Sequence, residues 1–206
     1  MGKSRCYISI KIDISPEGIP GKQERKIGMK VLVVIDMKND FLTGVLGNEE
    51  CANTISQVVD VVRNGNYDHI FLTRDTHSEN YMETQEGKKL PVPHCIKNTE
   101  GWEINADVMA AVKEKYDGQY TIVDKPTFGS ADLATKLKGI CENTYDTEIE
   151  FVGVCTGICV ISNVLLAKAN LYEAQVKVIE KACACVTPDT HRTAIDAMKT
   201  CQIDIV

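Results

Sequence analysis

From Lys30 onward, short apolar runs typical of β-strands alternate with amphipathic stretches typical of helices. This alternation constrains the fold strongly, because strand–helix–strand repeats build a parallel sheet with helices packed against it. The sequence therefore predicts an α/β domain whose mostly parallel sheet is flanked by helices on both faces. We expect strands at 30–36, 69–73, 120–124, 148–154, 175–180 and 202–206, and helices at 50–64, 106–116, 132–142, 157–169 and 188–200.

The size and charge of the chain limit the classes of partner. Its 206 residues are enough for one domain with a sizeable core. The net charge is -6, and the 23 basic residues are scattered along the chain. This distribution favours neither nucleic acid nor a membrane surface, and no stretch approaches the ~20 apolar residues of a membrane span. A small-molecule partner is expected instead.

The cysteine content indicates a reducing compartment. The chain has nine cysteines, an odd count, without the apolar core of a secretion signal. We therefore expect free thiols and a cytoplasmic location. A four-thiolate zinc site is the less favoured alternative, because the spacing lacks the context of a zinc finger. Its ligands would be Cys155, Cys159, Cys183 and Cys185.

The chain divides into a leader and a domain. Residues 29–206 carry the strand–helix pattern and form the predicted domain. Residues 1–28 are polar, and no function is assigned to them. Isoleucines nevertheless alternate within this leader, as they would in an added edge strand. They are Ile8, Ile10, Ile12 and Ile14.

Three reactive side chains follow predicted strands. Cys159 lies where the run 151–154 turns through small residues into a helix, and Asp36 and Lys125 end two other runs. Open α/β sheets bind ligands at the carboxyl ends of their strands, so these groups are expected at one edge. A helix N-terminus stabilises a thiolate, which would make Cys159 a nucleophile near pH 7. The alternative is that Cys159 is one more buried small hydrophobe.

The long polar connection 76–104 contains candidate metal ligands. Asp75 directly precedes it and His77 lies at its start. His94 follows a proline-stiffened Pro-Val-Pro turn, and Glu86 lies between the two histidines. A carboxylate with imidazoles suits Zn²⁺, Fe²⁺ or Mn²⁺ in a site with open positions. The alternative is a set of ordinary polar surface residues. We predict a divalent metal site, with zinc favoured.

Five segments in this order resemble the isochorismatase-like cysteine hydrolases, and within them the nicotinamidases most closely. The similarity covers 29–206 and implies a Rossmann-like three-layer domain. The segments are Val-Val-Ile-Asp36-Met-Lys-Asn-Asp-Phe41, Thr-Arg-Asp75-Thr-His77, Pro-Val-Pro-His94-Cys-Ile, Asp-Lys125-Pro-Thr-Phe128 and Gly-Val-Cys155-Thr-Gly-Ile-Cys159-Val.

The resemblance implies a catalytic triad of Cys159, Asp36 and Lys125. It also implies a cis peptide bond before Cys155, which directs the backbone N–H groups of Cys155 and Cys159 toward one oxyanion. The metal ligands implied are Asp75, His77 and His94, joined in some members by a glutamate at the position of Glu86.

Two positions near the expected pocket depart from the common family pattern. Gly157 replaces an aspartate, and Leu90 replaces an aromatic residue before the Pro-x-His turn. The expected substrate contacts are Leu90, Phe41 and Phe128, with Trp102 as a further candidate for ring stacking. We interpret His191, at a recurrent family position, as a helix-cap or packing residue.

The function predicted is hydrolysis of nicotinamide to nicotinate and ammonia through a thioester on Cys159. A related cysteine hydrolase acting on an N-carbamoyl compound or another small amide is the first alternative. A catalytically silent thiol or metal-binding protein is the second. Vinyl ether hydrolysis, as in isochorismatase, is disfavoured because that branch does not need the cysteine. A homo-oligomer is expected because relatives are often dimers or tetramers.

Overall fold

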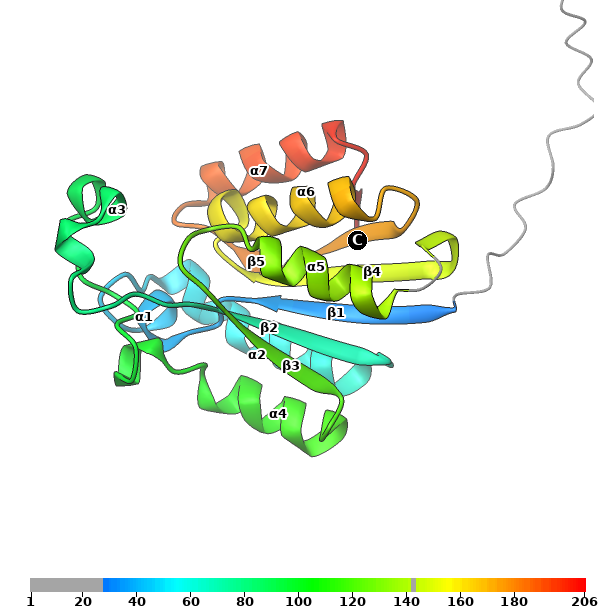
Figure 1. The fold of residues 1–206 in the computed structure, drawn as a ribbon, viewed down its shortest axis with the longest axis horizontal. Helices are drawn as coiled ribbons and strands as arrows, with labels where there is room; N and C mark the ends of the chain where they lie inside the picture. Colours follow the sequence, from blue (N-terminus) through cyan, green and yellow to red (C-terminus); the bar gives the residue numbers. More distant parts are fainter. Residues whose placement is uncertain (1–27, 142–143) are drawn as a thin grey trace, which may run out of the picture.

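The computed structural model describes residues 28–141 and 144–206, so the isoleucine strand predicted in the leader lies outside the described residues. Its centre is a six-stranded sheet in the order β3-β2-β1-β4-β5-β6, with every pair parallel (Figure 1). This confirms the predicted α/β class. The strands are β1 (Met29–Ile35), β2 (His69–Asp75), β3 (Tyr120–Lys125), β4 (Thr147–Val154), β5 (Gln175–Ala184) and β6 (Asp204–Ile205).

Helices cover both faces of the sheet and complete three layers (Figure 1). One face packs against α2 (Glu49–Asn64) and α4 (Ala106–Tyr116). The opposite face packs against α5 (Ala131–Ile140), α6 (Ile161–Asn170) and α7 (Pro188–Thr200). Each face therefore has its own hydrophobic core, with the sheet between them.

The central strand β1 shows why the sequence folds in this way. Val31 and Val33 pack toward α5 and α6, whereas Leu32 and Val34 pack toward α2 and α4, and all four are buried. A strand covered on both faces needs apolar residues at every position rather than at alternate ones. The continuous run 31–35 therefore favours the central position that β1 occupies.

Polar caps fix where helices start. The side chain of Asn48 accepts a hydrogen bond from the backbone N–H of Cys51 at the start of α2, and Ser130 does the same for Leu133 in α5. Thr187 caps α7 through a reciprocal pair of hydrogen bonds with Thr190. Such a cap contributes about 1 kcal/mol to helix stability.

Most elements differ from their predicted bounds by one or two residues, and two differ by more. Strand β5 continues past 180. Glu180 and Lys181 are exposed, but the three residues after them are buried, and Cys183 and Ala184 pair again with β4. The helix expected from 157 begins instead with a π-helical turn, Thr156–Val160. In this turn the Cys155 carbonyl accepts from the N–H of both Ile158 and Val160.

The long connection after β2 is ordered by short elements at the carboxyl ends of the strands, on the left in Figure 1. It is tied back through isolated bridges between His77 and Ile96 and between Lys38 and Ile104. Its elements are η1 (Tyr81–Glu83), α3 (Gln85–Lys89) and η2 (Glu100–Trp102), with α1 (Asn39–Leu42) beside them; η3 (Thr144–Asp146) lies before β4.

Within residues 28–141 and 144–206, no helix is both long and apolar enough to cross a membrane.

Candidate active site

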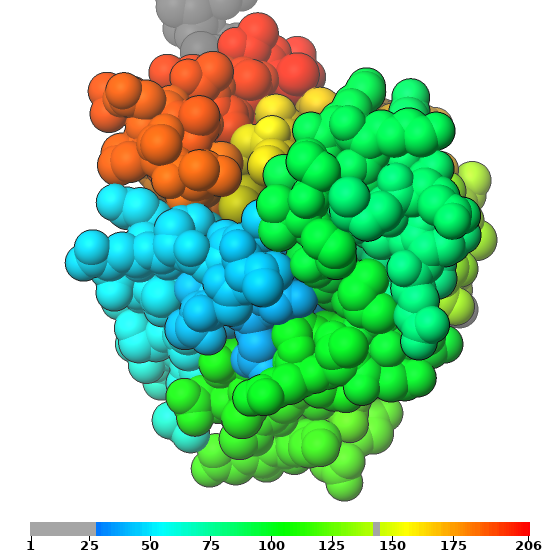
Figure 2. All heavy atoms as spheres, turned by 90° about the vertical axis from the view of Figure 1, so that its left-hand side faces the viewer, coloured from blue at the N-terminus to red at the C-terminus, as the bar shows by residue number. Residues whose placement is uncertain are grey.

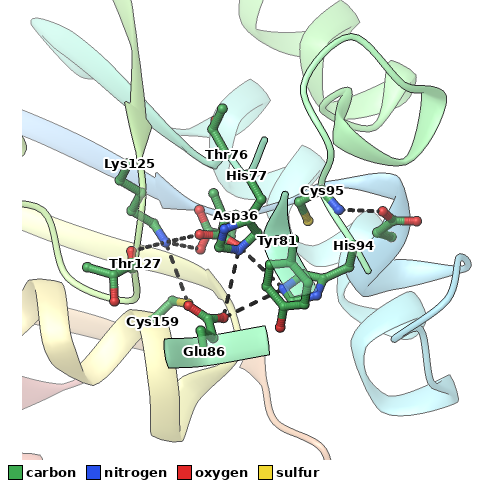
Figure 3. A network of polar contacts seen from close by, with 12 residues as sticks. Asp36, Thr76, His77, Tyr81, Glu86, His94, Cys95, Lys125, Thr127 and Cys159 are labelled. Atoms are coloured by element: carbon green, nitrogen blue, oxygen red, sulfur yellow. Dashed lines mark hydrogen bonds and ion pairs between the residues drawn. The ribbon is translucent and has the colours of Figure 1, made fainter. Parts of the chain in front are cut away.

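The sheet order brings four reactive positions to one edge. Asp36 follows β1, Asp75 ends β2, Lys125 ends β3, and Cys159 lies in the π-helical turn after β4. These four strands are neighbours, so side chains more than 100 positions apart meet above the centre of the sheet (Figure 3). Ligand sites of open α/β sheets lie at such an edge.

Lys125 joins the acid and the thiol of the predicted triad. Its Nζ lies 2.6 Å from Oδ2 of Asp36 and 3.7 Å from Sγ of Cys159 (Figure 3). All three residues are at most 5% exposed. The three groups predicted from separate strand ends are therefore within contact distance of one another.

Asp36 is held in place by its neighbour on β2. The hydroxyl of Thr73 donates to Oδ1 of Asp36 at 2.7 Å, and the backbone N–H of Asp36 donates to the same hydroxyl oxygen at 3.1 Å. Asp36 has a φ of 47°, in the left-handed region. The sequence analysis did not single out Thr73.

Burial dominates the electrostatics of the thiol. Burial and the charge of Asp36 raise the pKa of Cys159 well above its usual value, although Lys125 lowers it. These influences act against the thiolate expected near pH 7 and favour the thiol form of Cys159 in the site without substrate. Burial lowers the pKa of Lys125, but the negative charge of Asp36 outweighs burial and raises that pKa above its ordinary value. Lys125 remains a cation.

Strand β4 approaches β1 closely just before the thiol. A Cβ at Gly153 would lie 2.1 Å from the carbonyl oxygen of Ile35, and Gly153 has a φ of 116°. Only glycine fits this position without displacing the backbone that leads to Asp36. The next peptide bond, Val154–Cys155, is cis, as the resemblance implied.

The predicted metal ligands form a second group beside the first (Figure 3). His77 Nε2 lies 3.0 Å from Oδ2 of Asp75 and 3.7 Å from Oε1 of Glu86. His94 Nε2 lies 3.6 Å from the same Asp75 oxygen and 3.8 Å from Oε1 of Glu86. The structure thus brings together all four side chains, including Glu86.

The donor atoms of this group suit a cation. His94 directs Nδ1 at the carbonyl of Val92, 2.8 Å away, which leaves Nε2 with its lone pair in the neutral ring. Nε2 of His77 and Oδ1 of Asp75 are buried without a hydrogen-bond partner among the described residues. Burial raises the pKa of Asp75, but the neighbouring imidazoles of His77 and His94 outweigh burial and keep the carboxylate ionised. Imidazole nitrogens and carboxylate oxygens match Zn²⁺.

Cys95 is an addition to this group that the sequence analysis missed. Its Sγ forms a compact set with ligand atoms of Asp75 and His94. The described residues contain two groups of three potential metal ligands, and both groups lie at this site. The four-thiolate alternative built from Cys155, Cys159, Cys183 and Cys185 is therefore not formed.

A cavity of about 360 Å³ opens over both groups. Of the predicted substrate contacts, Phe41, Phe128 and Leu90 line it. Trp102 does not: it donates from Nε1 to Thr76 and stacks under Arg74, whose guanidinium lies 3.5 Å from the ring centre. Trp102 thus packs the loop.

Figure 2 looks onto this edge of the sheet, where residues of the blue, green, yellow and orange segments meet. The lining is Phe41, Leu46, Asp75, Glu86, Leu90, His94, Phe128, Cys155, Ile158, Cys159 and Val186.

His191 contacts the π-helical turn rather than capping a helix. Its Nδ1 lies 2.8 Å from the hydroxyl of Thr156, and its Nε2 lies 3.7 Å from Oε1 of Glu180. The cap of α7 is Thr187. Of the two roles expected for His191, packing is the one observed.

A parallel α/β sheet that carries a thiol, a carboxylate and an ammonium at its ligand edge is the arrangement expected of a hydrolase with a cysteine nucleophile. Residues 30–206 match the model of the isochorismatase domain. The chain belongs to the isochorismatase-like hydrolase family.

Similar proteins include nicotinamidases and pyrazinamidases. A nicotinamidase of Saccharomyces cerevisiae is 26% identical over 188 residues, covering 72% of this chain and 85% of the relative. A pyrazinamidase structure from Pyrococcus horikoshii, in complex with zinc, is 26% identical with a TM-score of 0.68, covering 86% of this chain and 98% of that one. A nicotinamidase/pyrazinamidase structure from Bacillus subtilis shares the fold, with a TM-score of 0.70 at 24% identity, and covers 86% and 99%.

Proposed function

We propose that this protein is a cysteine amidohydrolase for small heteroaromatic amides, with nicotinamide as the first candidate substrate. The observation that carries the proposal is the contact of Lys125 with both Asp36 and Cys159 beneath the cavity. Nicotinamidases and pyrazinamidases among the similar proteins support the same substrate class.

In the first half of the reaction, Asp36 takes the proton of the Cys159 thiol as sulfur bonds to the amide carbon. We take the thiol form of Cys159 as the starting point, because burial and Asp36 raise the pKa of Cys159. Collapse of the tetrahedral intermediate breaks the C–N bond, and Asp36 returns the proton to the departing nitrogen, which leaves as ammonia. The product of this half is a thioester on Cys159.

In the second half, Asp36 takes a proton from water while the water oxygen bonds to the thioester carbon. The C–S bond then breaks, the carboxylic acid leaves, and the proton returns to the thiol. Asp36 therefore takes up a proton and releases it twice per turnover. Thr73 holds its carboxylate in one orientation during these steps, which favours proton transfer in both directions.

Lys125 balances the charge of the site. During attack, negative charge moves between Cys159 and Asp36, and the ammonium contacts both groups. It lowers the pKa of the thiol against the effect of burial. Lys125 therefore stabilises the thiolate at the moment it forms without itself giving up a proton.

The oxyanion is assigned to backbone donors. We assign this role to the N–H groups of Cys155 and Cys159, at the two ends of the turn that follows the cis peptide. Losing one such donor costs ~3–4 kcal/mol of barrier in other hydrolases.

Asp75, His77, His94 and Glu86 would hold a divalent ion, for which their buried lone pairs and carboxylate oxygens fit. When bound, such an ion supplies a Lewis acid that accepts a ring nitrogen as a ligand. The chain itself contributes the rest of the substrate site: Phe41 lies with its ring centre 5.6 Å from that of His94, and Phe128 forms part of the cavity wall. A flat ring fits between such walls.

Ammonia release distinguishes the proposal from its alternatives. We would incubate the purified protein with nicotinamide, pyrazinamide and an N-carbamoyl amino acid and measure ammonia. Turnover of the two heteroaromatic amides supports the proposal. Turnover of the N-carbamoyl compound alone would assign the protein to the alternative amidohydrolase class, and no turnover of any amide would contradict catalysis.

A further inference from the structure

A cluster of three thiols lies beside the catalytic cysteine and has no part in the proposed reaction. We call Cys51, Cys155 and Cys185 the thiol cluster. Sγ of Cys51 lies 3.9 Å from Sγ of Cys155 and 3.8 Å from the carbonyl oxygen of Cys185. Cys155 and Cys185 each shift the pKa of the other, so their side chains are near one another. Cys155 is therefore the middle member.

The sheet register places two of these cysteines side by side. Val154 in β4 and Ala184 in β5 are parallel partners. Cys155 and Cys185 each come directly after these residues, so they follow neighbouring strands at the same level. Neighbouring strands are about 4.8 Å apart. A disulfide joins Cα atoms that are about 4.4–6.8 Å apart. A bond between these two sulfur atoms is therefore compatible with the spacing of the sheet.

The surroundings of Cys185 favour its thiolate. The Cys155 and Thr190 side chains and the backbone N–H groups of Gly157 and Val186 favour its ionised form. Cys155 is the largest influence, and together these groups outweigh burial and lower the pKa of Cys185 to about 5. Contacts with Cys185 and Cys51, and then burial, raise the pKa of Cys155. Cys185 is therefore the member of the pair that ionises more readily.

Gly157 makes room for this arrangement. A Cβ built on Gly157 would lie 3.4 Å from Sγ of Cys185, at the short end of van der Waals contact. A longer side chain would fill the space beside the sulfur. Glycine leaves that space open.

Small reagents can reach the pair from three sides. Cys185 is 2% exposed but forms part of the wall of two surface cavities. One, of about 370 Å³, also contains Gly157 and Thr190, and the other, of about 380 Å³, contains His191. Cys155 lines the active-site cavity. Such access suits a compact oxidant better than a bulky one.

We propose that Cys185 and Cys155 form an oxidation site for small hydroperoxides that closes a disulfide between β4 and β5. The Cys185 thiolate attacks the peroxide O–O bond, giving a sulfenic acid and, after protonation, an alcohol, or water if the oxidant is hydrogen peroxide. The Cys155 thiol then attacks that sulfur, forming the S–S bond and releasing water. Two thiols lose two electrons in total, and the hydroperoxide gains them.

A consequence for catalysis rests on the proposed function. Cys155 carries one of the two N–H groups assigned to the oxyanion and lies four positions before the nucleophile. A disulfide to Cys185 changes the packing of this residue, and its sulfur also lines the substrate cavity. We expect oxidation to reduce amide hydrolysis at least about tenfold and dithiothreitol to restore it.

Peptide mapping tests the bond directly. The protein would be treated with a small excess of hydrogen peroxide, alkylated, digested with trypsin and sequenced by tandem mass spectrometry. Digestion yields one peptide, 139–168, with Cys141, Cys155 and Cys159, and another, 182–192, with Cys183 and Cys185. We expect these peptides to be joined between Cys155 and Cys185. The full chain carrying Cys159→Ala removes the catalytic thiol as a competing partner.

Matched variants separate the two cysteines of the second peptide. Cys183→Ser should still form the bond, whereas Cys185→Ser should not. A bond through Cys183, a bond between Cys51 and Cys155, or oxidation without any bond to Cys185 would overturn the proposal. A folded, reduced Cys185→Ser protein, checked by circular dichroism, makes its loss of the bond informative.

The mapping does not depend on enzyme activity. A mapped disulfide in a protein that hydrolyses no amide would contradict the proposed function and leave the oxidation site standing. An active reduced enzyme that forms the disulfide without losing activity would overturn the catalytic consequence. An active enzyme without the disulfide would overturn the oxidation site alone.

Discussion

Lys125 forms an ion pair with Asp36, with Nζ and Oδ2 2.6 Å apart and both side chains fully buried. Two isolated charges would be costly to bury, and pairing them offsets that cost. The same ammonium lies 3.7 Å from the Cys159 sulfur. The ion pair therefore holds Asp36, the proposed acid–base group, and Lys125, the cation beside the thiol, in fixed positions next to Cys159.

Replacing the nucleophile should remove ammonia release and preserve the fold. Cys159→Ala deletes one buried sulfur atom, so we expect a melting temperature within a few degrees of the wild type. Amide hydrolysis should be undetectable because no thioester can form. Substantial turnover in this variant would exclude covalent catalysis by Cys159. Cys201→Ala, at an exposed position, is the matched control.

Removing the buried ammonium should make the thiol harder to ionise. Lys125 lowers the pKa of Cys159, so in Lys125→Met the pKa should rise and iodoacetamide should label Cys159 at higher pH. The variant should also lose ~3–5 kcal/mol of stability, because Asp36 is left as an unpaired buried charge. Lys136→Met, in a surface ion pair, serves as control. An unchanged labelling profile would argue against the electrostatic role.

The metal site predicts a selective loss of bound metal. His77→Ala and His94→Ala should each lower the metal content found by elemental analysis of the purified protein. His69→Ala should not, because His69 contacts Thr121 away from the site. Full metal content in both site variants would remove these histidines from the ligand set. Glu86→Gln then tests whether the carboxylate of Glu86 contributes.

The Thr73 hydroxyl should act through Asp36. Thr73→Val keeps the shape of the side chain but removes the donor to Oδ1, so we expect kcat to fall about tenfold with little change in KM. Thr73→Ser retains the hydroxyl and should recover most of the rate. Equal kcat values in the two variants would show that this hydrogen bond does not support catalysis.

Acid should weaken the amino end of the sheet through Glu148. Burial raises the pKa of Glu148, but hydrogen bonds from Lys177 and Lys30 outweigh it and lower the pKa below the ordinary value of 4.5. A lowered folded-state pKa stabilises the fold above the unfolded pKa and loses that effect as pH falls through the folded value. The difference in melting temperature between wild type and Glu148→Gln should therefore be largest near pH 7 and shrink below about pH 4. A constant difference would contradict this assignment; Glu114→Gln, in an exposed pair, is the control.

The sequence predicted those parts of the fold and site that follow from local patterns. The run before Asp36 is apolar at every position because β1 is covered on both faces, and its end marks the ligand edge. Lys125 and Asp75 are recognisable for the same reason, as polar residues that end apolar strands. The motif resemblance then assigned roles that strand ends alone could not.

Other site features depend on contacts between distant segments. Thr73 is an interior strand residue, and only the pairing of β1 with β2 brings its hydroxyl to Asp36. Val186 and Leu46 are apolar residues that reach the cavity from segments in which the sequence predicted no substrate contact. A pattern of apolar residues could not separate Trp102 in the loop packing from Phe41 in the cavity wall.

Mass spectrometry of the intact protein during turnover tests the central claim most directly. The protein would be mixed with nicotinamide, quenched in acid within the first turnovers and weighed, with Cys159→Ala treated in parallel. We predict a mass gain equal to the nicotinoyl group in place of one hydrogen, on Cys159 alone and absent from the variant. Ammonia release by the wild type with no adduct, together with undiminished release by Cys159→Ala, would contradict the account.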